Sequence, residues 1–139
     1  MQYQTITRSA LAMAATVLGT AAVVAGDKPA LDKDAIDKSF EALKAFDWGV
    51  YNLQFRKLLG PIEDAVPATH GDAAARKELE TRLAAMLSTG ASRAAKDFVC
   101  RKLTIIGTAE SVPALAALLP DKDLSHMARH VLELSLIHI

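Results

Sequence analysis

The stretch 95–133 almost repeats itself, and this near-repeat limits the folds that the chain can adopt. Three apolar positions recur as apolar positions 29 residues later: Ala95 as Leu124, Phe98 as Met127 and Leu103 as Leu132. A short segment with its own turn residues, 107–119, separates the two copies. Helical pairs that repeat at such a spacing stack on one another and expose broad surfaces, which are typical of interaction proteins. The near-repeat therefore predicts an array of stacked helices.

The composition favours helices and argues against several classes of function. Ala and Leu dominate, and runs of β-branched or aromatic residues are scarce, which predicts an all-α fold. The 16 basic and 16 acidic residues are interspersed, so no charged stripe indicates a nucleic-acid partner or an anionic membrane surface. The sequence has no phosphate-binding loop, paired-carboxylate site or haem-attachment motif. We expect neither catalysis nor a cofactor.

Apolar periodicity and turn residues divide the chain into seven expected helices. The first ends near Phe46, and the next two, 50–59 and 62–69, are separated by Gly60 and Pro61. N-cap residues and apolar stripes predict four more helices in the second half: 72–89, 92–106, 110–119 and 124–133. No Gly/Ser linker interrupts the series, which predicts one helical domain over 35–133.

The helices from 61 to 133 are expected to pair antiparallel, to stack with one hand and to bury a shared core. Its expected members are apolar residues at helical spacing: Leu83, Phe98, Leu103, Leu115, Leu119 and Leu132. The acidic neighbours Glu63-Asp64 and Glu78-Glu80 are expected on solvated helix faces. Trp48 is expected to be a packing anchor.

The first 25 residues have the features of a secretory signal peptide. Arg8 is their only charge, 10–24 is a weakly polar to apolar run, and Val23-Val-Ala25 supplies small residues for cleavage. The run is shorter than the roughly 20 apolar residues that span a bilayer. We therefore expect export to the periplasm or the extracellular space, with 26–34 as a short leader. A retained membrane anchor or a buried core helix is the alternative reading of 1–25.

The last six residues, 134–139, read Leu-Ser-Leu-Ile-His-Ile and resemble the translation of an adapter used in sequencing libraries. A genuine apolar helix end is the alternative. The adapter interpretation excludes these residues, His138 among them, from the fold. It also predicts that the natural gene continues and that this chain is an N-terminal fragment.

The segment Gly107-x-x-Glu110-Ser111-Val112-Pro113-x-Leu115-x-x-x-Leu119, followed by Asp121-x-Asp123, resembles HEAT-like repeats of the short form named for phycobilisome lyases. The wider stretch 40–133 is similar to exported HEAT-repeat proteins of the planctomycete type. This resemblance implies a short α-solenoid of antiparallel helix pairs, clearest over 72–133. It also implies a non-catalytic scaffold that mediates contacts with a protein or a neighbouring domain.

Polar, outward positions on the second helix of each pair are the expected contact residues: Lys96, Arg101, Lys102, His126, Arg129 and His130. His126 and His130 are four residues apart and could hold a metal with Asp123, but surface histidines are the favoured interpretation. Cys100 could be a nucleophile, but its apolar neighbours favour a buried thiol.

Two other functions stay open at the level of the sequence. The chain could be the accessory N-terminal domain of a larger exported enzyme whose catalytic part is missing. The repeat's name also suggests a bilin lyase, but those proteins are cytoplasmic, and a signal peptide argues against this function.

Overall fold

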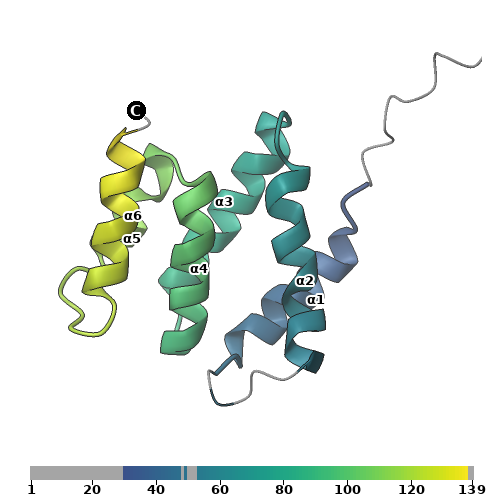
Figure 1. Cartoon of the computed structure of the whole chain (residues 1–139), viewed down its shortest axis with the longest axis horizontal. Helices are drawn as coiled ribbons and strands as arrows, with labels where there is room; N and C mark the ends of the chain where they lie inside the picture. Colours follow the sequence, from purple (N-terminus) through teal and green to yellow (C-terminus); the bar gives the residue numbers. More distant parts are fainter. Residues whose placement is uncertain (1–29, 48, 50–52, 138–139) are drawn as a thin grey trace, which may run out of the picture. The chain divides into compact units, whose positions relative to one another are not determined.

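A computed structural model describes residues 30–47, 49 and 53–137 (Figure 1). The expected signal peptide, 1–25, and Trp48 lie outside the described residues. Every regular element in the described part of the chain is a helix, which confirms the all-α fold. The elements are α1 (Lys33–Lys44), α2 (Leu53–Ala68), α3 (Ala73–Leu87), α4 (Arg93–Ile106), the 3₁₀ turn η2 (Ala109–Ser111), α5 (Val112–Ala116) and α6 (Ser125–Ile137). They belong to one compact unit that begins at Leu31.

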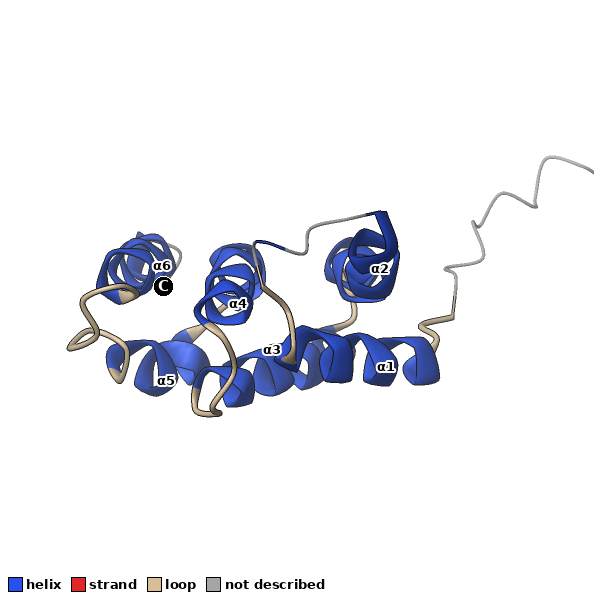
Figure 2. Ribbon diagram, turned by 90° about the horizontal axis from the view of Figure 1, so that it is seen from below, coloured by secondary structure: helices blue, strands red, loops and turns tan. Residues whose placement is uncertain are grey.

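The helices of this unit form two layers. Figure 2 shows α2, α4 and α6 side by side in one layer and α1, α3 and α5 in the other. Contacts join α1 to α2, α3 to α4 and α5 to α6, and α4 also contacts both α2 and α6. Within the middle pair, Arg76 near the start of α3 donates to the carbonyl of Ile105 near the end of α4 at 2.8 Å. The two helices of this pair therefore run in opposite directions.

The core lies between the two layers and contains most of the expected apolar residues. Leu83, Leu103 and Leu115 are fully buried, whereas Phe98 and Leu132 are half-buried against the same cluster. The prediction for Leu119 was wrong, because its side chain is 41% exposed. The helix that was expected to carry it ends at Ala116, so Leu119 lies in the following turn and leaves the buried stripe.

The predicted break at Gly60 and Pro61 was also wrong, because α2 is continuous through both residues. Pro61 has no N–H to donate to the carbonyl four residues before it, which normally weakens a helix. Ser39 of α1 lies against this turn, is almost fully buried, and donates from its hydroxyl to the carbonyl of Leu58 at 2.5 Å. The carbonyl that Pro61 deprives of its helical donor is that of Lys57, so Ser39 does not replace the missing bond but ties the next carbonyl of the same turn to α1.

A continuous α2 also changes which of its residues are buried. Leu59 is buried with Ile62, Ala65 and Val66 on one face. Leu58 is 45% exposed, and Arg56 and Lys57 beside it are exposed as well. Because α2 is one helix where the sequence predicted two, residues 59 to 66 share a single apolar face.

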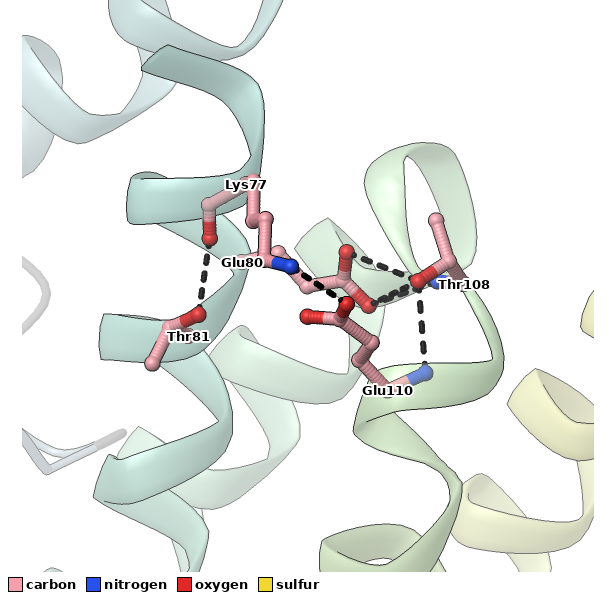
Figure 3. Close-up of polar contacts among 5 residues, drawn as sticks. All are labelled: Lys77, Glu80, Thr81, Thr108 and Glu110. Carbon is pink, nitrogen blue, oxygen red and sulfur yellow. Dashed lines mark hydrogen bonds and ion pairs between the residues drawn. The ribbon is translucent and has the colours of Figure 1, made fainter. Parts of the chain in front are cut away.

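The loop before α5 is held by a buried carboxylate (Figure 3). Glu80 of α3, which was expected on a solvated face, is only 3% exposed. Its carboxylate accepts from the Thr108 N–H at 2.6 Å and from the Thr108 hydroxyl at 3.0 Å. Beside it, Lys77 pairs with Glu110 at 2.6 Å, and this hydrogen bond raises the pKa of Lys77. These contacts tie α3 to the start of the last helix pair.

A serine joins the first helix pair to the second. Ser92 caps α4 by accepting from the Ala95 N–H at 3.0 Å, as the sequence predicts. Its hydroxyl also donates to the carbonyl of Phe46, just after α1. Across the described residues, no helix combines the length and the apolar character that crossing a membrane requires.

Candidate interaction groove

The six expected contact residues lie on α4 and α6, but the structure does not bring them into one site. Arg101 and Lys102 of α4 line a hollow between α2 and α4. Arg101 and His126 line another hollow, between α4 and α6. The other three lie outside these hollows: Lys96 is half-buried, and Arg129 and His130 are exposed on α6. The site is therefore centred on α4 rather than spread evenly over the second helices.

The first hollow, about 290 Å³, has an apolar floor and a charged rim. Phe46, Leu59 and Phe98 form the floor, and the rings of Phe46 and Phe98 meet edge to face with centroids 6.4 Å apart. Arg56 and Arg101 belong to the rim. An apolar floor with cations beside it suits a ligand that carries both an apolar group and an anionic group.

The second hollow, about 530 Å³, continues between the same two helices toward their C-terminal ends. Its apolar side chains are Val66 and Pro67 of α2 and Ile105 of α4, and Ile105 is 60% exposed. Arg76 of α3 contributes a guanidinium. An exposed isoleucine beside a cation is again a surface that an apolar and anionic ligand would cover.

Glu63 and Lys102 line both hollows, so we treat the two together as the α2–α4 groove. The Lys102 ammonium lies 2.8 Å from the Glu63 carboxylate and 4.8 Å from the centre of the Phe98 ring. Glu63 is 43% exposed and Lys102 is 18% exposed. The Glu63 side of the pair is open to solvent, so a carboxylate of a ligand can reach Lys102 and take the place of Glu63.

The α2–α4 groove is rich in cations. Four basic side chains line it: Arg56, Arg76, Arg101 and Lys102. Among the described residues that line its two hollows, Glu63 is the one carboxylate. Arg101 also donates to Asp97 at 2.9 Å, but its side chain remains 62% exposed. The whole chain is neutral, so this local excess of positive charge comes from the fold, which gathers cations from three helices.

The hollow between α4 and α6 has a mixed electrostatic character. Three basic residues, Arg93, Arg101 and Lys122, line it together with two acidic ones, Asp97 and Asp123. Arg93 at the start of α4 pairs with Asp123, in the turn before α6, at 3.4 Å. The excess of positive charge is smaller here than in the α2–α4 groove, which is therefore the stronger candidate site.

Cys100 is a buried thiol, which confirms the interpretation that its apolar neighbours in the sequence favoured. It is fully buried in the core cluster on α4. Burial, with a smaller contribution from the nearby Asp97, raises the pKa of its thiol to about 11. Since the thiolate is the nucleophile, a thiol that stays protonated at neutral pH inside the core is inert.

His126 and His130 do not form a metal site with Asp123 in the described part of the chain, where no three potential ligands converge. The Asp123 carboxylate instead faces Arg93.

Sequence reasoning missed the α2 half of the groove. Arg56 and Glu63 were not predicted as contact residues, because the predicted break at Gly60 and Pro61 placed them in two separate short helices. The apolar floor was missed because Phe46 was expected to end a helix and Phe98 to fill the core. The i, i+7 spacing of Arg56 and Glu63 would have placed them on one face, had α2 been treated as continuous.

Comparison with known proteins found no matching family model, no matching curated protein and no matching solved structure.

Proposed function

We propose that residues 35–133 are a non-catalytic, HEAT-like scaffold that binds a protein, or a neighbouring domain, through the surface of α2, α4 and α6. The observation that carries this proposal is the α2–α4 groove, where an apolar floor and exposed cations lie along two neighbouring helices. Interfaces of this kind draw affinity from a buried apolar centre and specificity from charged residues at the rim.

The HEAT-like α-solenoid is part of the same proposal. Leu59 and Phe98 line the first hollow, and residues seven positions later on each helix line the second. The α2 and α4 helices therefore run in the same direction, as the second helices of successive repeats do in a solenoid. The recurrence of apolar residues at a 29-residue spacing between α4 and α6 supports the same arrangement.

Export is proposed on the sequence of residues 1–25 alone. Expression of the full chain in a bacterial host tests it by mass spectrometry of the periplasmic fraction. We expect a mature form that begins at Gly26. Recovery of only the uncleaved chain would contradict cleavage of the signal.

Selection from an unbiased peptide-display library on the immobilised chain tests the binding function. We expect enriched peptides whose binding is lost in the double variant R101E/K102E, because this variant reverses two charges of the groove. The control is R129E, which reverses a charge on α6 outside the groove. Absence of enriched peptides, or equal binding to R101E/K102E, would contradict the proposed surface.

A further inference from the structure

We propose that the α2–α4 groove binds a short, extended, acidic segment of another protein, in which two carboxylates lie between two apolar side chains three positions apart. This inference rests on the proposed function and specifies the ligand of its groove. It follows from three features of the groove, which are its width, the spacing of its apolar hollows and its charge.

The width of the groove favours an extended ligand over a helix. The Lys102 and Glu63 side chains meet across it at 2.8 Å, so they leave no open channel as wide as a helix at this level. An α-helix with its side chains is about 10 Å wide and cannot enter between them. An extended backbone can lie along the groove and send individual side chains into the hollows on either side of the pair.

The spacing of the hollows sets the spacing of the ligand's apolar side chains. Phe98 and Ile105 are seven residues apart on α4, as are Leu59 and Val66 on α2. Seven helical residues span about 10 Å. In the polyproline II conformation, residues i and i+3 lie on the same side of the chain about 9 Å apart. A ligand in this conformation places one apolar side chain in each hollow.

The charge of the groove determines the chemical type of the two ligand residues that lie between the two apolar side chains. Residues i+1 and i+2 of the ligand lie at the level of Lys102 and Arg101, and Arg56 adds a cation at the end of the first hollow. Carboxylates at these positions complement the excess of cations and replace Glu63 as the partner of Lys102. Glu63 is therefore a competitor for the ligand, whereas Lys102 is an anchor.

This competition predicts opposite effects for the two residues of one ion pair. If the ion pair served only the structure, replacing either residue would weaken peptide binding or leave it unchanged. Replacing Lys102 removes the anchor and weakens binding, but replacing Glu63 frees the anchor and strengthens binding. Lys102→Met keeps an unbranched side chain but removes the ammonium that lies over the Phe98 ring, and Glu63→Gln keeps the shape of the side chain.

Fluorescence anisotropy with a labelled peptide of core Pro-Phe-Glu-Glu-Leu-Pro tests the proposal on the full chain. We expect Lys102→Met to weaken binding about tenfold, the factor for one lost charge-assisted hydrogen bond. We expect Glu63→Gln to strengthen binding about threefold. Lys57→Met is the matched control, since Lys57 is exposed on α2 but lines neither hollow, and its effect should stay within about twofold. Arg56→Gln, on the exposed rim, gives a second weakening variant should Lys102→Met fail to fold.

Three results would overturn the inference. They are no binding of the acidic peptide below about 1 mM, equal binding of a Pro-Phe-Lys-Lys-Leu-Pro peptide, and weaker binding by a folded Glu63→Gln variant. The selection from the peptide library distinguishes a wrong ligand assignment from a wrong binding function. Enriched peptides that are not acidic would remove the ligand assignment alone, whereas the absence of any enriched peptide would remove both.

Discussion

At the scale of single residues, the buried carboxylate of Glu80 ties the middle helix pair to the last one. It accepts both the N–H and the hydroxyl of Thr108, and that hydroxyl in turn accepts from the Glu110 N–H at 3.3 Å (Figure 3). The Glu80 side chain is the buried partner of these bonds, and hydrogen bonds to a charged group contribute more to stability than bonds between neutral groups. One side chain therefore holds the turn that sets where α5 begins.

We predict that Glu80→Ala lowers the free energy of unfolding by about 2–3 kcal/mol, because the N–H of Thr108 loses its charged acceptor. Urea denaturation followed by circular dichroism measures the change. Glu78→Ala is the matched control, since Glu78 is exposed on the same helix, and it should cost less than about 0.5 kcal/mol. Equal losses in the two variants would contradict a structural role for the Glu80 carboxylate.

Cys100 gives a prediction with a defined pH window. The pKa of its thiol is raised from 9.0 in the unfolded chain to about 11 in the fold, so the folded state holds the proton more tightly. The contribution of this thiol to the free energy of unfolding is fully present below pH 9 and is lost as the pH rises through about 11. We expect the wild type to lose more stability than Cys100→Ala between these pH values in urea denaturation. A difference between the two proteins that does not change with pH would contradict the raised pKa.

At the scale of elements, α2 shows where sequence reasoning succeeds and where it stops. Caps and apolar stripes are local, so Asp72, Ser92 and the stripe of α3 were predicted correctly. Gly60 and Pro61 are also local signals, but they predicted a break that the fold overrides. Tertiary packing accompanies the override, since Ser39 of α1 donates to the carbonyl of Leu58 in the same turn. No pattern within 50–69 contains that information.

We predict that Ser39→Ala destabilises the protein by about 1–2 kcal/mol, because the carbonyl of Leu58 loses a buried donor beside Pro61. Thermal or urea unfolding measures the loss. Thr81→Ala is the control, since the Thr81 hydroxyl bonds within its own exposed helix face, and it should change stability by less than about 0.5 kcal/mol. A Ser39→Ala variant as stable as the wild type would show that α2 tolerates Pro61 without help from α1.

The candidate site could be predicted in part, for a similar reason. Arg101 and Lys102 were found because polar positions on the second helix of a pair can be read from periodicity. Arg56, Glu63 and Arg76 were missed, because they join the groove only through the packing of α2 and α3 against α4. Lys96, Arg129 and His130 are also polar positions on second helices, but they lie outside the hollows. Periodicity shows which residues share one face of a helix, but it does not show which other helix packs against that face.

At the scale of the whole helical unit, the layered arrangement predicts uneven stability. The α3–α4 pair has a neighbouring pair on each side, whereas α1–α2 and α5–α6 each have one. In a stacked array, stability is roughly a sum of contacts between neighbours. We expect native-state hydrogen exchange to be slowest in α3 and α4 and faster in the two outer pairs. Uniform exchange across all helices would indicate a bundle that opens as one unit.

The central claim is that the α2–α4 groove is the surface through which this protein binds another. Hydrogen–deuterium exchange of the full chain, with and without a peptide enriched from the unbiased library, tests it most directly. We predict that the peptide slows exchange in α2 and α4 around Glu63 and Lys102, and that α1 and α5 do not change. Protection confined to α1, α3 and α5, on the opposite layer, would contradict the claim.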